Sequence, residues 1–153
     1  ILKICANSCN SRNLCPKNKT TTMSNNFEDI VSKDLVDIIL SNFYRVHNEL
    51  GYGFLENVYK NALYFALKDE GLKCETEKQI KVYFDGRVVG TYYADILVED
   101  CIILELKTVK EISPAHEAQL INYLKATDIE IGYLLNFGTS AKFSRKIFTN
   151  DRK

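Results

Sequence analysis

The sequence has no long hydrophobic run, no recognisable secretory signal and no surplus of positive charge. A helix needs about 20 consecutive apolar residues to cross a membrane, and no stretch of this sequence approaches that length. We therefore expect a soluble, cytoplasmic protein that does not bind membranes. Lys and Arg together number 20, as do Asp and Glu, and this balance is unlike that of a basic DNA-binding domain.

Paired Cys-x-x-Cys spacings are also absent, although the chain has five cysteines. Cys5, Cys9 and Cys15 lie within residues 1–22, a segment with no acidic residue and little sustained periodicity. This composition predicts a disordered tail, and Met23 is a candidate start of translation. The alternative is a zinc-binding knuckle, but three loosely spaced cysteines do not supply the four ligands of such a site.

Residues 23–153 are expected to form a single domain with one hydrophobic core. All 20 acidic residues lie here, whereas four of the 20 basic ones lie in the tail, which leaves this part with a net charge of −4. Cys74 and Cys101 are interpreted as small buried residues rather than as a disulfide. A basic cluster near the C-terminus is either a nucleic-acid contact or a solvated chain end. Its members are Lys142, Arg145, Lys146, Arg152 and Lys153.

Apolar residues recur at three- and four-residue spacing in three segments, which predicts amphipathic helices. The first helix runs from 29 to 50 and ends at Gly51. The second follows Gly53 and ends at Gly71, and the third begins at Ser113-Pro114 and ends near residue 127. Strands are predicted at 79–84, 87–98, 102–107, 131–137 and 143–148, with an Asp85-Gly86 hairpin turn between the first two.

Three ionisable residues interrupt the hairpin formed by the second and third of these strands. The apolar runs 96–98 and 102–104 indicate two buried strands, yet Asp95, Glu105 and Lys107 lie beside them. A buried carboxylate costs several kcal/mol unless it is neutralised. Lys107 can neutralise one carboxylate, and the other favours a divalent cation, because carboxylate oxygens and water are the usual ligands of Mg²⁺ and Mn²⁺.

The length of the hairpin loop decides whether the two carboxylates face each other. A two-residue loop would place Asp95 opposite Leu104 and the carboxylates on opposite faces of the sheet. A three-residue loop, 99–101, or a bulge of one residue places Asp95 opposite Glu105, with Lys107 on the same face. We predict this second register, in which a cation between the carboxylates would offset their repulsion.

Asp95 followed by Glu105-Leu106-Lys107 resembles the D…ExK signature of the PD-(D/E)XK nuclease superfamily. Residues 53–59, Gly-Phe-Leu-Glu-Asn-Val-Tyr, resemble the G-x-x-E-x-x-Y motif of the GxxExxY family, a branch of that superfamily. Further similar segments are 47–51, 117–124 and 134–138, and the resemblance extends over about residues 30–149. It implies a restriction-endonuclease-like α/β core with a helix, a three-strand meander, a helix and a strand, in which helices flank a mixed central sheet.

The resemblance also implies a metal-dependent nuclease that hydrolyses phosphodiester bonds of DNA or RNA. Mg²⁺ or Mn²⁺ would be held by Asp95, Glu105 and the carbonyl of Leu106, with Glu56 in reach directly or through water. Lys107 would orient the attacking water or the phosphate. Glu56 has a simpler explanation from its position alone, because the helix dipole stabilises an acidic residue in the first turn.

The remaining expected site residues surround that centre. Gln119 and Tyr123 share one helix face, and the resemblance suggests that they contact the nucleic-acid backbone, with Arg145 as a further contact. His47 is interpreted as a cap or packing residue rather than a metal ligand. Tyr59 is expected to pack in the core while its hydroxyl fixes a neighbouring carboxylate.

A second function stays open, namely a catalytically silent interaction module with the same fold. Asp95, Glu105 and Lys107 would then form an internal ion-pair network. The small size and acidic charge of the chain favour this alternative, whereas the intact metal ligands argue against it, because paired buried carboxylates are costly without a cation. A homodimer is a further expectation, because members of nuclease superfamilies often pair.

Overall fold

The computed structural model describes residues 31–153, so the predicted tail at 1–22 lies outside the described part of the chain. In chain order the elements are α1 (Lys33–Leu50), α2 (Glu56–Asp69), β1 (Cys74–Phe84), β2 (Arg87–Val98), β3 (Ile102–Lys107), α3 (Pro114–Lys125), β4 (Ile131–Phe137), β5 (Ala141–Ile147) and the 3-10 helix η2 (Asn150–Arg152). No helix within 31–153 has both the length and the apolar character that a membrane span requires.

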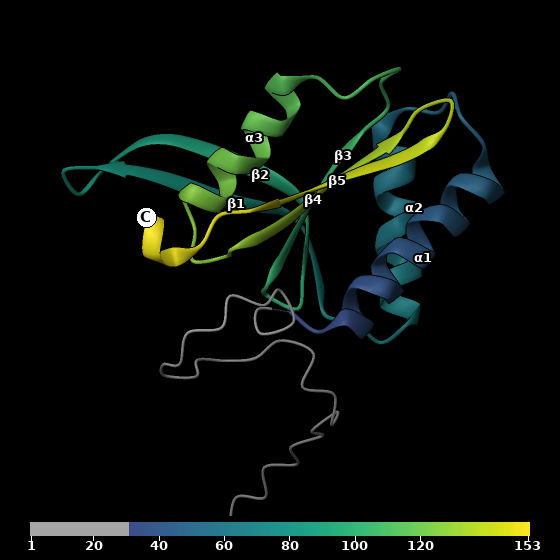
Figure 1. Cartoon of the computed structure of the whole chain (residues 1–153), viewed down its shortest axis with the longest axis horizontal. Coiled ribbons are helices and arrows are strands. Elements are labelled where there is room, and N and C mark those ends of the chain that lie inside the picture. The colour runs from purple at the N-terminus through teal and green to yellow at the C-terminus, as the bar shows by residue number, and fades with distance from the viewer. Residues whose placement is uncertain (1–30) are drawn as a thin grey trace, which may run out of the picture.

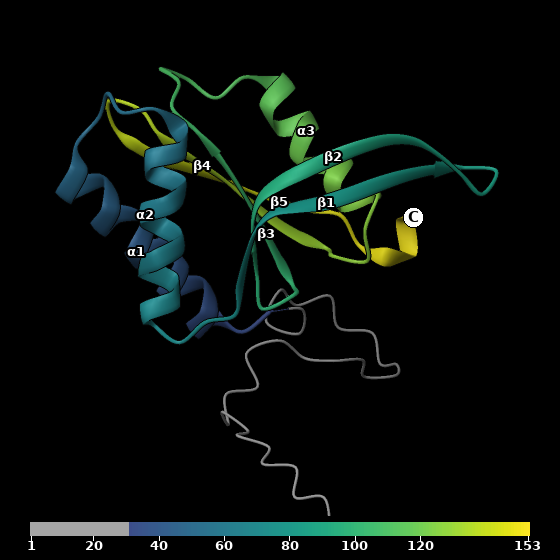
Figure 2. The same cartoon turned by 180° about the vertical axis from the view of Figure 1, so that it is seen from behind.

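The five strands form one mixed sheet in the order β1-β2-β3-β4-β5. Neighbouring strands are antiparallel except β3 and β4, which are parallel and are joined by the α3 crossover. α1 and α2 lie on one face of the sheet and α3 lies on the other (Figures 1 and 2). The predicted α/β architecture, a three-strand meander followed by a helix and a strand, is confirmed.

Two hydrophobic clusters join the helices to the sheet. The larger one packs α1 and α2 against the sheet, and the Phe137 ring lies at its centre, edge-on to Phe43 and stacked on Tyr59. The smaller one packs Leu120 and Leu124 of α3 against the opposite face. β3 and β4 are covered on both sides, which explains their continuous apolar runs.

Several element boundaries differ from the prediction by a few residues, for example that of β5, which begins at Ala141 rather than at 143. Two of the differences have clear local reasons. α1 begins at Lys33 rather than at 29, because the Ser32 side chain caps the helix by accepting a hydrogen bond from Leu35 N at 3.3 Å. β1 begins at Cys74, earlier than predicted, because its pairing with β2 extends to Cys74↔Val98. The added strand residues are mostly charged or polar, so their hydrophobic pattern gave no strand signal.

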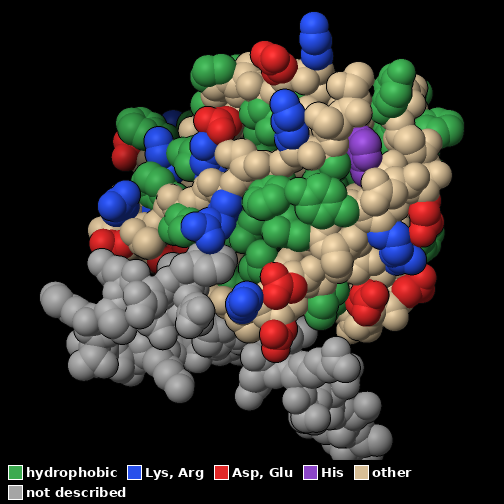
Figure 3. All heavy atoms as spheres, turned by 45° about the vertical axis from the view of Figure 1, so that its right-hand side comes forward, with side chains coloured by type: hydrophobic (Ala, Val, Ile, Leu, Met, Phe, Trp, Pro, Cys, Tyr) green, Lys and Arg blue, Asp and Glu red, His purple; other side chains and the backbone are tan. Residues whose placement is uncertain are grey.

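The surface on the α1–α2 side carries charges of both signs. Figure 3 brings this side forward and shows hydrophobic side chains gathered near the middle of the face, with both basic and acidic side chains around them. The described part of this face therefore offers no single-sign patch of the kind that binds nucleic acid electrostatically.

A buried asparagine holds the loop that follows β3. Asn136, in β4, is 1% exposed. Its Oδ1 accepts a hydrogen bond from Val109 N at 3.0 Å, and its Nδ2 donates to Val109 O at 2.8 Å. Both backbone groups of Val109 thus have a partner in the side chain of Asn136, which fixes the path of the chain just after Lys107.

We expect Asn136→Leu to lower the free energy of unfolding by about 1–3 kcal/mol, because it leaves these Val109 groups without partners. Urea denaturation would measure the loss. Asn61→Leu makes the same change at an exposed position of α2 and should change stability by no more than about 0.5 kcal/mol. Equal effects of the two substitutions would contradict this role of Asn136.

Candidate active site

The candidate site lies where β2 separates from β3. The ladder between these strands runs from Val98↔Ile102 to Ile96↔Leu104, and the loop between them is residues 99–101. The next pair in this register is Asp95 opposite Glu105. The predicted three-residue loop and its register are therefore confirmed. The loop depends on two residues with positive φ, Glu99 and Asp100 at 50° and 56°.

The side chain of Asp95 is tied to the backbone of β3. Its Oδ2 accepts a hydrogen bond from Leu106 N at 2.8 Å. Burial raises the pKa of Asp95, and the Leu106 N–H, Lys60 and Lys107 act in the opposite direction. This carboxylate lies on β2, but it is held by a hydrogen-bond donor on β3 and by the charge of Lys60 on α2.

Glu105 is the most deeply buried acidic residue of the site, at 3% exposure. Its Oε1 accepts a hydrogen bond from Lys107 Nζ at 2.7 Å, while its Oε2 is buried and has no hydrogen-bond partner. Burial, followed by the charge of Asp95, raises the pKa of Glu105 to about 7 against the effect of Lys107. A buried carboxylate oxygen without a partner is costly, and a cation would satisfy it.

Lys60 and Glu77 belong to the site although the sequence did not indicate them. Lys60 Nζ is hydrogen-bonded to Glu77 and lies 3.7 Å from Asp95 Oδ1. Burial alone would lower the pKa of Lys60, but Glu77, Asp95 and Glu56 raise it overall, so the ammonium stays charged. A lysine in a helix is usually solvated, and only the packing of α2 on the sheet turns this one inward.

Glu56, the first residue of α2, lies close enough to the other charges to respond to them. The pKa of Glu56 is raised overall, chiefly by burial. Lys107 and Lys60 act to lower it, and Asp95 adds to the increase. α2 therefore brings a third carboxylate into the electrostatic range of Asp95 and Glu105. The favourable helix dipole also acts on Glu56 at this position, so the two explanations of this residue are compatible.

His47 and Tyr59 both stabilise the fold next to the site. His47 Nε2 donates to Gly138 O at 2.9 Å, which is a packing role. The Tyr59 hydroxyl donates to Gly51 O at 2.8 Å and accepts from Phe54 N at 3.3 Å. The expectation that this hydroxyl fixes a carboxylate is therefore wrong, because its partners are backbone groups of the turn before α2.

The three expected nucleic-acid contacts are not brought together. Gln119 Nε2 donates to the Tyr123 hydroxyl at 2.6 Å, but Tyr123 is only 2% exposed and packs between α3 and the sheet. In this arrangement Tyr123 is buried away from any nucleic acid. Arg145 pairs with Tyr133 and hydrogen-bonds its hydroxyl. Because Tyr133 packs on the α1–α2 side, Arg145 lies on the opposite face from Gln119.

The C-terminal basic cluster is divided in a similar way. Lys146 Nζ lies 2.7 Å from Glu117 Oε1, and Lys153 Nζ donates to the carbonyls of Thr127 and Ile129. These two cations are therefore engaged within the fold. The cluster does not act as one free basic patch.

The donor set of the site fits a divalent metal in part. Asp95 and Glu105 offer two coupled carboxylates, and Mg²⁺ usually takes one or two carboxylates and keeps several waters. The unpartnered Glu105 Oε2 supports the same fit. Within 31–153, however, no three Asp, Glu, His or Cys side chains are close enough to form a complete metal site. Water or a backbone carbonyl would have to supply the remaining ligands.

The raised pKa of Glu105 gives a pH dependence that can be measured without metal. Folded Glu105 keeps its proton up to about pH 7, whereas the unfolded carboxyl has its ordinary value of 4.5. The folded state therefore binds more protons between these values, and stability should fall as pH rises through that interval. The difference corresponds to about 3 kcal/mol. Urea denaturation in a chelator should show that the free energy of unfolding falls less with rising pH in Glu105→Gln than in the parent. An equal fall in the two proteins would contradict the prediction.

Comparison with known proteins identifies the superfamily. A family model described as PD-(D/E)XK nuclease superfamily matches residues 33–147. No curated protein matches the chain. The crystal structure of SSO0001 is similar over 76% of this chain and 58% of that protein, with 20% sequence identity and a TM-score of 0.47. Because the family model spans all five strands and α1, α2 and α3, the chain belongs to the PD-(D/E)XK nuclease superfamily.

Proposed function

We propose that this chain is a metal-dependent nuclease that hydrolyses phosphodiester bonds of DNA or RNA. The observation that carries the proposal is the buried Oε2 of Glu105, which lacks a hydrogen-bond partner at the position opposite Asp95. Mg²⁺ or Mn²⁺ would be held by Asp95, Glu105 and the Leu106 carbonyl, with Glu56 in reach directly or through water. Superfamily membership supports this assignment.

The residues around the proposed metal have separate tasks. A bound divalent ion would supply a water of lowered pKa and positive charge beside the phosphodiester. The Leu106 N–H and Lys60 hold the Asp95 carboxylate in a fixed orientation. Lys107, which donates a hydrogen bond to Glu105, is a fixed cation that can orient the phosphate or the attacking water.

We further propose that the chain belongs to the GxxExxY branch of the superfamily. The motif residues Gly53, Glu56 and Tyr59 support this assignment, because each has a structural use. Gly53 has a φ of 111°, a value that favours glycine. Tyr59 binds the turn that contains Gly53, and Glu56 starts α2 near the two strand carboxylates.

The second candidate is a catalytically silent interaction module. Lys107 already pairs with Glu105, and Lys60 lies within ion-pair distance of Asp95. These contacts favour an internal ion-pair network that needs no metal. A cleavage assay separates the two candidates.

The assay uses the full chain with labelled single- and double-stranded DNA and RNA, in Mg²⁺ and in Mn²⁺. We expect cleavage of at least one substrate, and a loss on the order of a hundredfold or more in Asp95→Asn and Glu105→Gln, because each removes a charged ligand. Glu75→Gln, the same change on the exposed part of β1, should retain the activity. Cleavage that persists in both site variants would contradict the assignment. A folded parent that cleaves no substrate would favour the interaction module.

A further inference from the structure

A pocket of about 340 Å³ lies between the β1–β2 hairpin and α3. We call it the arm pocket, because the hairpin extends as an arm past the helices (Figures 1 and 2). It is lined by Val82, Tyr92, Asn122, Lys125 and Ala126. This volume is in the range of small-ligand sites. No residue of the candidate active site lines it.

The arm carries aromatic side chains that the fold leaves uncovered. Tyr83, Phe84, Tyr92 and Tyr93 are each at least 42% exposed. A group of exposed apolar side chains often marks an interaction site. Nucleic-acid bases are suitable partners, since stacking on an aromatic side chain is sequence-tolerant and favourable for any unpaired base.

The charge of the arm pocket favours an anion. Lys125 is the charged residue in its lining, and no lining residue is acidic. Lys125 Nζ lies 5.5 Å from the centre of the Phe148 ring, and among the described residues no carboxylate is within ion-pair distance of it. The β1–β2 hairpin as a whole, residues 74–98, has three basic and four acidic residues, so the preference for an anion rests on Lys125.

One residue connects the arm pocket to the candidate active site. The Tyr92 ring lies 5.6 Å from the Tyr123 ring. Burial raises the pKa of Tyr123, and the charges of Glu105, Lys107 and Asp95 also act on its hydroxyl. Tyr92 also lies three residues before Asp95 on β2, which is about 10 Å along a strand. The arm pocket and the candidate carboxylates therefore lie along the same strand.

We propose that the arm pocket binds one nucleotide of a single-stranded nucleic acid whose neighbouring phosphodiester lies at the active site. The base stacks on Tyr92, the amide of Asn122 hydrogen-bonds the base edge, and Lys125 binds a phosphate. This inference rests on the proposed nuclease function and gives its substrate class. Duplex bases are stacked on each other and cannot offer a face to Tyr92, so a single strand is the preferred ligand.

The test measures binding without cleavage. Labelled oligothymidylate and oligouridylate of about 15 nucleotides, a length that covers one ordinary single-strand site, are titrated with the full chain in chelator, and fluorescence anisotropy is recorded at several salt concentrations. A duplex of the same length should bind more weakly. Comparison of the two oligonucleotides shows whether the pocket prefers DNA or RNA.

Two variants probe the pocket, each with a matched control. Tyr92→Ser should weaken binding about five- to a hundredfold, since stacking of one base is worth about 1–3 kcal/mol, whereas Tyr92→Phe keeps the ring and should stay within about twofold. Lys125→Glu should weaken binding and reduce the slope of log K against log salt by about one. Lys68→Glu, the same change on the exposed end of α2, should leave the slope unchanged.

The outcomes separate this inference from the proposed function. The proposed nucleotide site is wrong if the parent binds neither oligonucleotide, even if cleavage occurs. It is also wrong if Tyr92→Ser and Lys125→Glu bind like the parent. Binding that depends on Tyr92 and Lys125 without cleavage in Mg²⁺ or Mn²⁺ would support the pocket and refute the nuclease. If Tyr92→Ser fails to fold by circular dichroism, Lys125→Glu alone decides the question.

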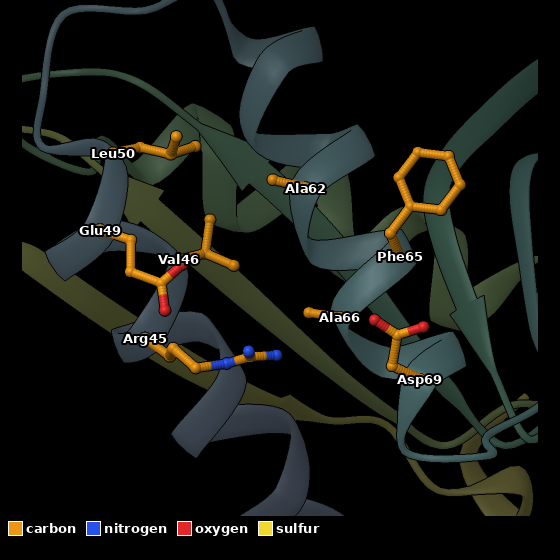
Figure 4. Close-up of a pocket in the computed structure, with 8 residues that line it drawn as sticks. All are labelled: Arg45, Val46, Glu49, Leu50, Ala62, Phe65, Ala66 and Asp69. Carbon is orange, nitrogen blue, oxygen red and sulfur yellow. The ribbon is translucent and has the colours of Figure 1, made fainter.

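A second pocket, between α1 and α2, does not share this chemistry. Its lining mixes apolar side chains with Arg45, Glu49 and Asp69 (Figure 4). Acidic and basic groups in the same lining favour neither an anion nor a cation.

Discussion

The burial of two opposed carboxylates at a point where strands separate is the constraint on which the rest of the site depends. Asp95 and Glu105 are placed by one strand register, and the low exposure of Glu105 makes its charged form costly. Lys107 and Lys60 offset part of this cost from two different elements. One oxygen of Glu105 still has no hydrogen-bond partner, so the fold keeps an unsatisfied carboxyl group in its interior.

Each layer of the fold contributes one part of this arrangement. β2 and β3 supply the carboxylates, α2 supplies Lys60 and the nearby charge of Glu56, and α3 closes the opposite side with Tyr123. The helices are fixed by contacts away from the site, such as Tyr59 on the Gly51 turn. The positions of the charged groups are therefore consequences of ordinary core packing.

The sequence predicted the architecture and the strand register, because both follow from apolar periodicity and loop length. It did not predict Lys60 and Glu77, since their approach to Asp95 depends on how α2 packs on the sheet. It assigned Tyr123 and Arg145 to nucleic-acid contacts, but Tyr123 is buried between α3 and the sheet and Arg145 hydrogen-bonds Tyr133. Motif spacing predicts where a residue lies along a helix or strand. How deeply its side chain is buried depends on which other elements pack against it.

Calorimetric titration of the full chain with Mg²⁺ and Mn²⁺ near pH 7 shows whether Asp95 and Glu105 hold a metal. We expect one site, lost in both Asp95→Asn and Glu105→Gln and retained in Glu75→Gln. Binding should release a proton from Glu105, because the raised pKa keeps that carboxyl partly protonated near pH 7. Heats that vary with the ionisation enthalpy of the buffer would reveal this proton. No binding at millimolar ion, or binding that survives both substitutions, would contradict a metal site at Asp95 and Glu105.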